Sequence, residues 1–251
     1  MTPQPNDAFP ADPAPASAPT PGADPAPMTP QQYGVGARFT LSVYDSDYVA
    51  IILGALAEAD ATGLTVETGD ISTFVTGTEQ RVLAFIRDVV TAAARGGAHL
   101  SASILLSRGC PGELQCALPA GVAALGADPV SLDPSGVRAR AHWSLYPLLD
   151  GGPGSENSPA VDHMAPIYAA IEEAKAAGVY SGSDHYATRL DGDLAAVLQT
   201  AANAWIGVGA AVQHVVTHLT VSINSPSINS PSSTSSSSTS SSSISPSPTR
   251  N

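Results

Sequence analysis

Histidine and aspartate side chains gather in the second half of the chain, where they could support acid–base or metal chemistry. His214 and His218 have the spacing that places two metal ligands on one face of a helix. The residues around them alternate between apolar and polar types, which predicts a strand, and four strand residues span about 13 Å. One ion could not bridge that distance. Asp193 is explained as a helix cap and Asp184-His185 as turn residues, so the sequence predicts no metal site.

The motifs that mark nucleotide binding and hydrolysis are missing from the sequence. The Gly-Val-Gly segment at Gly34 lacks the third glycine of a dinucleotide-binding loop and precedes a strand, and no Gly-x-Ser-x-Gly occurs. Cys110 and Cys116 do not have the Cys-x-x-Cys spacing of a redox pair, although a local disulfide between them stays open. We therefore expect a non-catalytic protein.

Composition and charge narrow the class of partner. The chain of 251 residues carries a net charge of -12 at pH 7, which repels nucleic acid and anionic lipid. Its two cysteines cannot form a disulfide framework, which indicates a cytoplasmic protein. Residues 194–212 are uncharged but contain Gln199 and Asn203, and the matching segment of the other half carries charges. This pattern predicts a buried amphipathic helix rather than a membrane-inserted one.

Shifts in composition divide the chain into five segments. Residues 1–32 are rich in Pro and Ala and residues 227–251 in Ser, so we expect a disordered arm and a disordered tail. Between them we expect two folded repeats, residues 33–112 and 137–226, joined by a linker at residues 113–136.

The two folded segments are copies of one module. Residues 38–44 (Arg-Phe-Thr-Leu-Ser-Val-Tyr) line up with residues 140–146 (Arg-Ala-His-Trp-Ser-Leu-Tyr) at an offset of 140 − 38 = 102. From residue 55 onward the offset is 115, which places Thr73 on Thr188 and His99 on His214. A Gly/Pro/Ser-rich insertion at residues 150–163 accounts for the change. Similarity sustained over this length indicates an internal duplication.

Each copy predicts the same order of elements. A strand with period-two alternation is followed by a helix that we expect to end at Gly63 or Gly178, then by two short strands. A second helix, capped by Thr78 or Asp193, precedes a last strand. The order βαββαβ predicts an α+β fold of tandem ferredoxin-like repeats, with antiparallel sheets and helices on one face.

The sheet face that the helices leave bare carries small polar side chains. They are Thr40, Ser42, Ser101 and Ser103 in the first copy and His142, Ser144, His218 and Thr220 in the second. They have two explanations: an ordinary solvated face, or sheets that pack together and leave hydroxyl-lined crevices for a small polar ring compound. In the second case, two copies imply two related sites.

Several segments together resemble the YkoF family of thiamine- and hydroxymethylpyrimidine-binding proteins. The segments are residues 38–44, Asp-Ile-Ser-Thr at 70–73, Ser-Arg-Gly-Cys-Pro-Gly at 107–112, Ser-Leu-Tyr-Pro at 144–147, His-Tyr-Ala-Thr at 185–188, Leu-Asp-Gly-Asp at 190–193 and Ser-Ile-Asn-Ser-Pro at 222–226. The resemblance implies a homodimer with one thiamine or hydroxymethylpyrimidine site in each repeat, no other cofactor, and a role in uptake or salvage with a membrane transporter as partner.

The resemblance also implies which residues contact the ligand. The implied hydroxyl contacts are Thr73, the adjacent Ser72, and Thr188; the implied backbone contacts are Val43 and Leu145; the implied walls are His142, Cys110 and Pro111. The first repeat departs from the pattern, because Asp45 follows Tyr44 where Pro147 follows in the second. Its first turn also has Gly-Asp at 69–70 in place of Asp-His. We therefore expect two unequal pockets, with the loop at residues 150–163 covering the second.

Two alternatives from other classes stay open. One is an enzyme of pyrimidine or thiamine metabolism that uses His185 and Asp191. The other is a regulatory module whose sheets pair without a ligand and whose tails recruit partners.

Overall fold

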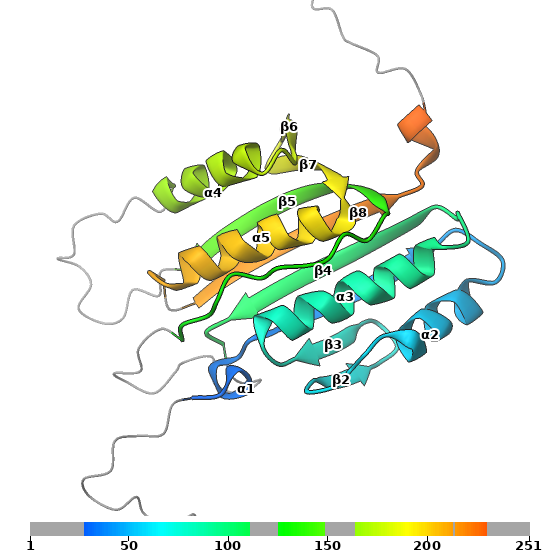
Figure 1. Ribbon diagram of the computed structural model, residues 1–251, viewed down its shortest axis with the longest axis horizontal. Helices are drawn as coiled ribbons and strands as arrows, with labels where there is room; N and C mark the ends of the chain where they lie inside the picture. The colour runs from blue at the N-terminus through cyan, green and yellow to red at the C-terminus, as the bar shows by residue number, and fades with distance from the viewer. Residues whose placement is uncertain (1–27, 111–124, 149–163, 213, 230–251) are drawn as a thin grey trace, which may run out of the picture.

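The computed structural model describes residues 28–110, 125–148, 164–212 and 214–229 (Figure 1). A short helix, α1 (Pro30–Tyr33), precedes the first repeat, so the boundary expected at residue 32 falls inside it. The first repeat contains β1 (Gly36–Val43), α2 (Tyr48–Glu58), β2 (Thr65–Thr68), β3 (Thr73–Thr76), α3 (Glu79–Ala94) and β4 (Leu100–Arg108). The second contains β5 (Arg138–Leu148), α4 (Ala165–Ala176), β6 (Tyr180–Asp184), β7 (Ala187–Asp193), α5 (Leu194–Gly209) and β8 (His214–Ile223), and η2 (Pro226–Asn229) follows it. The predicted order βαββαβ is confirmed in both.

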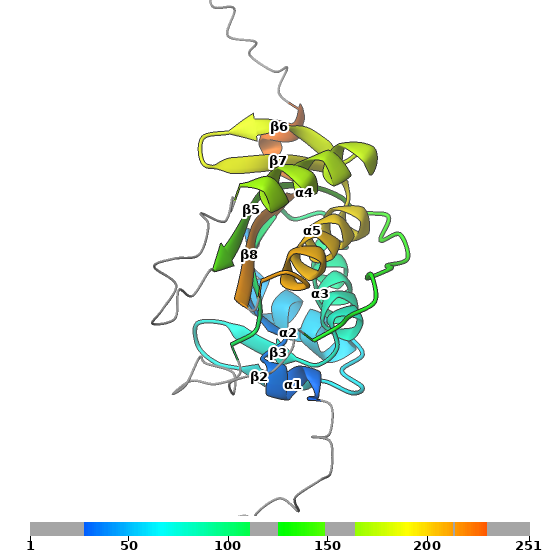
Figure 2. The ribbon, with the colours of Figure 1, turned by 90° about the vertical axis from the view of Figure 1, so that its left-hand side faces the viewer.

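The two repeats share one continuous antiparallel sheet of eight strands. Its order is β2-β3-β1-β4-β8-β5-β7-β6, so each half has the ferredoxin-like order and the halves meet where β4 pairs with β8. All four long helices cover the same face, where α3 and α5 lie side by side (Figure 2). The α+β prediction is confirmed, and the last strand of each repeat becomes a central strand of the joined sheet.

The sheet register corrects the alignment of the first strand of each repeat. Phe39 of β1 pairs with Thr73, and Trp143 of β5 pairs with Thr188. Pairing of the same strands with β4 and β8 gives the same result. Since Thr73 and Thr188 are equivalent, Trp143 is the counterpart of Phe39, and the offset is 143 − 39 = 104 rather than 102. A shift of two residues keeps every side chain on its face, so alternation could not reveal it.

Two element ends differ from their predicted positions. The helix expected to run to Gly63 ends at Glu58, because the chain turns at Asp60, whose carboxylate accepts hydrogen bonds from the Thr62 N–H and from Arg81. In the second repeat Gly178 does follow the helix, with a φ of 72°. The turn expected at residues 183–184 lies two residues later, at residues 185–186, since β6 extends to Asp184.

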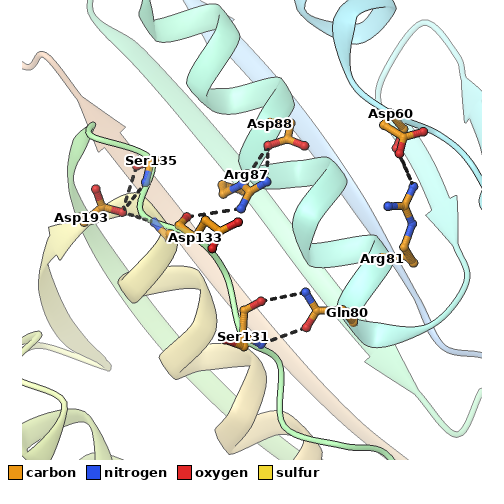
Figure 3. Close-up of polar contacts among 10 residues, drawn as sticks. Asp60, Gln80, Arg81, Arg87, Asp88, Ser131, Asp133, Ser135 and Asp193 are labelled. Carbon is orange, nitrogen blue, oxygen red and sulfur yellow. Dashed lines mark hydrogen bonds and ion pairs between the residues drawn. The ribbon is translucent and has the colours of Figure 1, made fainter.

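The described part of the linker lies across the helices as an extended strap (Figure 1). Gln80 exchanges two hydrogen bonds with the backbone of Ser131, and Asn203 exchanges two with the backbone of Val130 (the first pair is drawn in Figure 3). Gln199 accepts another from the Leu132 N–H. These amides satisfy backbone groups that would be left unpaired over the apolar helices. Polar residues of α3 and α5 therefore hold the linker in place.

The α5 helix contains 16 residues. No helix within the described ranges has the length and apolar character needed to cross a membrane.

Asp193 joins the strap to the start of α5 (Figure 3). Its carboxylate accepts hydrogen bonds from the N–H groups of Ala195, Ser135 and Gly136 at 2.8 to 3.0 Å, and from the Ser135 hydroxyl at 3.0 Å. Burial raises the pKa of Asp193, but hydrogen bonds from Ser135, Ala195 and Gly136 lower it by more, so the pKa lies below its ordinary value.

Replacing Asp193 by alanine is expected to lower the free energy of unfolding by about 2 kcal/mol at pH 7, because a helix cap and several charge-assisted hydrogen bonds are lost. Because the pKa of Asp193 is lower in the folded protein than in the unfolded one, its carboxylate stabilises the fold at pH values above the unfolded-state pKa. This contribution is lost as the pH falls through the folded-state pKa. The difference from wild type should therefore shrink below about pH 4. Urea denaturation at a series of pH values measures this difference in the free energy of unfolding. Asp133→Ala is the matched control, because among the residues that the structure describes Asp133 is engaged through its backbone carbonyl, by Arg87, and not through its carboxylate.

Candidate functional site

Two pockets occupy equivalent places in the two repeats, on the helix-covered side of the sheet. Each lies between the first strand, the first helix and the hairpin that joins the two short strands. The first, of about 270 Å³, is lined by Phe39, Thr40, Leu41, Tyr48, Val49, Ile52, Leu53, Leu56, Thr68, Gly69, Asp70, Ile71, Ser72 and Thr73. The second, of about 320 Å³, is lined by Trp143, Ser144, Leu145, Tyr146, Ile167, Ile171, Asp184, Tyr186, Ala187 and Thr188.

The linings correspond position by position once the corrected register is used. At an offset of 104, residues 39–41 of β1 coincide with residues 143–145 of β5. At an offset of 115, six helix and hairpin positions coincide as well: Ile52 with Ile167, Leu56 with Ile171, Gly69 with Asp184, Ile71 with Tyr186, Ser72 with Ala187, and Thr73 with Thr188. The offset of 102 would separate the strand positions. The two pockets are therefore equivalent products of the duplication.

A threonine at the start of the second hairpin strand lies in the wall of each pocket. The Thr73 hydroxyl is 3.1 Å from the Thr68 hydroxyl across the β2–β3 pair. The Thr188 hydroxyl makes no hydrogen bond to any residue that the structure describes. In a pocket lined mostly by apolar side chains, such a hydroxyl is available to a ligand as donor or acceptor.

The second pocket has an aromatic floor that is held in place by hydrogen bonds. The Trp143 indole is buried, with 3% of its surface exposed, and its Nε1–H donates to the Thr217 hydroxyl at 2.8 Å. Thr217 in turn donates to the Ser144 carbonyl at 3.0 Å. Because both donors have acceptors, the ring cannot turn without losing a buried hydrogen bond. Its position is fixed before any ligand arrives.

Charged groups at the rim of the second pocket are already paired. Asp184 Oδ2 lies 2.8 Å from His142 Nε2 and 3.4 Å from Arg189 Nε. In the first pocket the equivalent position is Gly69, and Asp70 follows it. The two rims therefore differ in charge as well as in shape.

The structure places four of the eight expected site residues in the pocket linings. Ser72 and Thr73 line the first, and Leu145 and Thr188 line the second. Val43, at the end of β1, lies outside the lining of the first pocket. Its counterpart in the corrected register is Pro147, so the contrast drawn between Asp45 and Pro147 compared positions that are not equivalent.

The remaining expected residues lie elsewhere. His142 is on the helix-free face, where it contacts the rim residue Asp184. Cys110 follows β4 and is half-buried, outside both linings. Pro111 and the loop at residues 150–163 lie outside the described residues, as does Cys116.

Four helix residues that line the pockets at equivalent positions were expected from the sequence only as the apolar stripe of the first helix, not as site residues. They are Ile52, Leu56, Ile167 and Ile171. Their helical spacing is the ordinary signal of core packing, and nothing in a single strand-helix pattern separates a pocket wall from a core contact. The signal that could have found them is their equivalence between the copies at an offset of 115.

The helix-free face carries the polar residues expected there. Ser103 and His218 lie 3.1 Å apart, and Ser101 pairs with Ser222 across the seam between the repeats. The equivalent pockets lie on the opposite side of the sheet. Asp191 is held on the helix-free face by Arg138 and Arg140.

Comparisons with known proteins agree with this division. A sequence model described as the YKOF-related family matches residues 34–113 and 138–228. The "Putative HMP/thiamine-binding protein YkoF" of Bacillus subtilis (strain 168) is 30% identical over 195 residues, which cover 76% of this chain and 90% of that protein. The two matched segments coincide with the two structural repeats, each of which carries one of the two equivalent pockets.

Proposed function

This chain belongs to the YkoF family, and from that premise we propose that it binds thiamine or its hydroxymethylpyrimidine precursor in both pockets, without transforming it. The observation that carries the proposal is the pair of equivalent hollows. Apolar walls and one threonine hydroxyl recur at matching positions in both copies. A cavity left by imperfect packing would not be expected at the same position in two repeats whose other side chains differ.

The chemistry of the walls suits a substituted pyrimidine ring. Thiamine and hydroxymethylpyrimidine share an aminopyrimidine, which has ring-nitrogen acceptors and an amino donor. A threonine hydroxyl can serve either, and strand-end backbone groups can serve the other. Apolar side chains from the first helix cover the ring faces, while Ser72 in the first pocket adds a second hydroxyl. The pockets are at the small end of ligand sites, which fits a ligand of one or two rings.

Binding without catalysis is favoured by how far apart the candidate catalytic residues lie. His185 lies in the turn before β7, and Asp191 lies four residues beyond Ala187, the first residue of β7, which is about 13 Å along an extended strand. Asp191 is engaged by Arg138 and Arg140, whose hydrogen bonds lower its pKa against the effect of burial. A carboxylate fixed in its ionised form between two guanidinium groups is poorly placed to accept a proton.

Replacing Thr188 by valine is expected to weaken binding at the second pocket by about 1–3 kcal/mol, or roughly 5- to 150-fold, because ligand polar atoms lose a buried partner. Stability should change little, since the hydroxyl has no described protein partner. Titration followed by isoleucine methyl NMR separates the two pockets. Ile52 reports on the first, and Ile167 and Ile171 report on the second.

The matched control is Thr220→Val, on the helix-free face of β8, which should leave both affinities unchanged. Equal loss in Thr220→Val and Thr188→Val would remove Thr188 from the site. Calorimetry tests the function itself. If neither compound produces heat or methyl shifts with the wild-type chain at millimolar concentration, the proposed function is wrong.

The wider role follows from the family resemblance rather than from the pockets. We infer a homodimer that serves uptake or salvage of thiamine or its precursor, in the cytoplasm, with a membrane transporter as partner. Sedimentation velocity with and without thiamine tests the homodimer. A chain that stays monomeric at micromolar concentration in both conditions contradicts it.

A further inference from the structure

The tips of the two pocket hairpins each present one large apolar side chain to solvent. Ile71 is 81% exposed and Tyr186 is 100% exposed, the two highest values for large hydrophobic residues in the described part of the chain. They are equivalent at an offset of 115, and each belongs to the lining of its own pocket. Because an exposed apolar side chain recurs at this position in both copies, we expect it to have the same function in both. We call the edge of each pocket at the hairpin tip the pocket mouth.

The second tip also has an unfavourable backbone conformation. Tyr186 has a φ of 66°, in the left-handed region that glycine and asparagine favour and bulky residues avoid. The Ser144 hydroxyl donates to the Tyr186 carbonyl at 3.3 Å, which links the tip to the strand that lines the pocket. Strained residues of this kind concentrate at ligand sites. Glycine would relieve the strain, but it would remove the ring.

The two proposed ligands differ in what they place at the mouth. Both contain the aminopyrimidine, whereas thiamine adds a thiazolium ring with a permanent positive charge. Thr73 and Ile71 line one pocket and Thr188 and Tyr186 the other, so a ligand whose pyrimidine contacts the threonine can bring its second ring to the hairpin tip. A tyrosine face attracts a cationic ring through its quadrupole, and an isoleucine offers only apolar contact. Tyr146, half-exposed in the same lining, adds a second aromatic side chain to the second mouth.

We propose that Tyr186 makes the second pocket selective for the thiazolium-bearing ligand, whereas Ile71 leaves the first pocket without that preference. This inference rests on the proposed function, because it assumes that both compounds enter the pockets. Carboxylates are present near both tips: Asp70 in the first, and Asp184 with His142 and Arg189 in the second. Comparing variants within one pocket holds these charges constant.

The experiment exchanges the tip side chains. Tyr186→Leu removes the ring from the second pocket, with leucine chosen because a β-branched residue would be strained at this φ. Tyr186→Phe keeps the ring face, and Ile71→Tyr adds a face to the first pocket. Tyr168→Leu is the control, because Tyr168 is an exposed tyrosine of α4 that lines neither pocket. Thiamine and hydroxymethylpyrimidine are titrated against each variant, read at Ile52 and Ile167.

Tyr186→Leu should lower the ratio of thiamine to hydroxymethylpyrimidine affinity in the second pocket about two- to fivefold. Tyr186→Phe and Tyr168→Leu should leave the ratio unchanged, and Ile71→Tyr should raise it in the first pocket. If both compounds bind but Tyr186→Leu leaves the ratio unchanged, the inference is wrong while the proposed function stands. If neither compound shifts the wild-type methyl signals, the proposed function fails, and this inference fails with it.

Discussion

Replacing Arg108 by alanine is expected to lower the free energy of unfolding by about 3–5 kcal/mol, because it leaves a buried carboxylate without its counter-ion. Arg108 ends β4 and is 1% exposed. One guanidinium nitrogen lies 3.5 Å from Glu79 Oε1, and that carboxylate oxygen is buried with no hydrogen bond. Unfolding in urea, followed by circular dichroism, measures the loss.

Arg108 also joins segments that are distant in the sequence. Its guanidinium donates to the carbonyls of Ile206, at the end of α5, and of Leu125, in the linker. The rings of Tyr33 and Trp205 lie 5.7 and 5.8 Å from it. The side chain therefore connects β4 of the first repeat to α1, the linker and the second repeat, and its loss should loosen their docking.

Two comparisons make this prediction testable. Arg95→Ala breaks the exposed ion pair with Glu58, which should cost less than about 1 kcal/mol. Combining Arg108→Met with Glu79→Met removes both charges and should recover much of the stability, as replacement of buried ion pairs by apolar groups often does. A loss in Arg108→Ala no larger than in Arg95→Ala would contradict the assignment.

Replacing Trp143 by alanine is expected to have two large effects. Removing a buried indole should cost about 3–5 kcal/mol of stability, as for other large-to-small core changes. It also removes the floor of the second pocket, so ligand-induced shifts at Ile167 should disappear. Those at Ile52 in the first pocket should persist. Methyl NMR at a temperature where the variant remains folded measures both pockets in one sample.

The corrected register supplies the matched control for this prediction. Trp143→Phe introduces the residue that the first repeat carries at the equivalent position, Phe39. It removes the hydrogen bond to Thr217 but leaves that hydroxyl donating to the Ser144 carbonyl. We expect a smaller loss of stability and retained binding in the second pocket. Complete loss of binding in Trp143→Phe, with the fold intact, would show that the indole itself rather than an aromatic floor is required.

The two repeats show which features of the fold can be predicted from sequence patterns. Apolar periodicity and the caps Thr78 and Asp193 predicted the order of elements in both copies and the start of α3 and α5 correctly. These features depend on contacts within one turn of helix or between neighbouring residues of a strand. The family resemblance pointed to Thr73 and Thr188, which line the pockets.

The errors lie where a pattern is compatible with more than one arrangement. The strand alignment at an offset of 102 preserved the faces of β1 and β5, because side chains repeat every two residues. It missed that Phe39 faces Thr73 in one repeat as Trp143 faces Thr188 in the other. The polar residues of the helix-free face suggested crevices there. The equivalent pockets formed on the other side, where the first helix leaves space beside the hairpin.

The sequence by itself determined the duplication, the ferredoxin-like order and the residues that face the core, because each is encoded in local periodicity. Only the tertiary structure decided that β4 and β8 join the repeats into one sheet, and that the linker lies over α3 and α5. It alone also decided that Arg108 and Glu79 are buried together. Each of these depends on backbone and side-chain partners far apart in the chain, whose pairing is selected by the whole packed core.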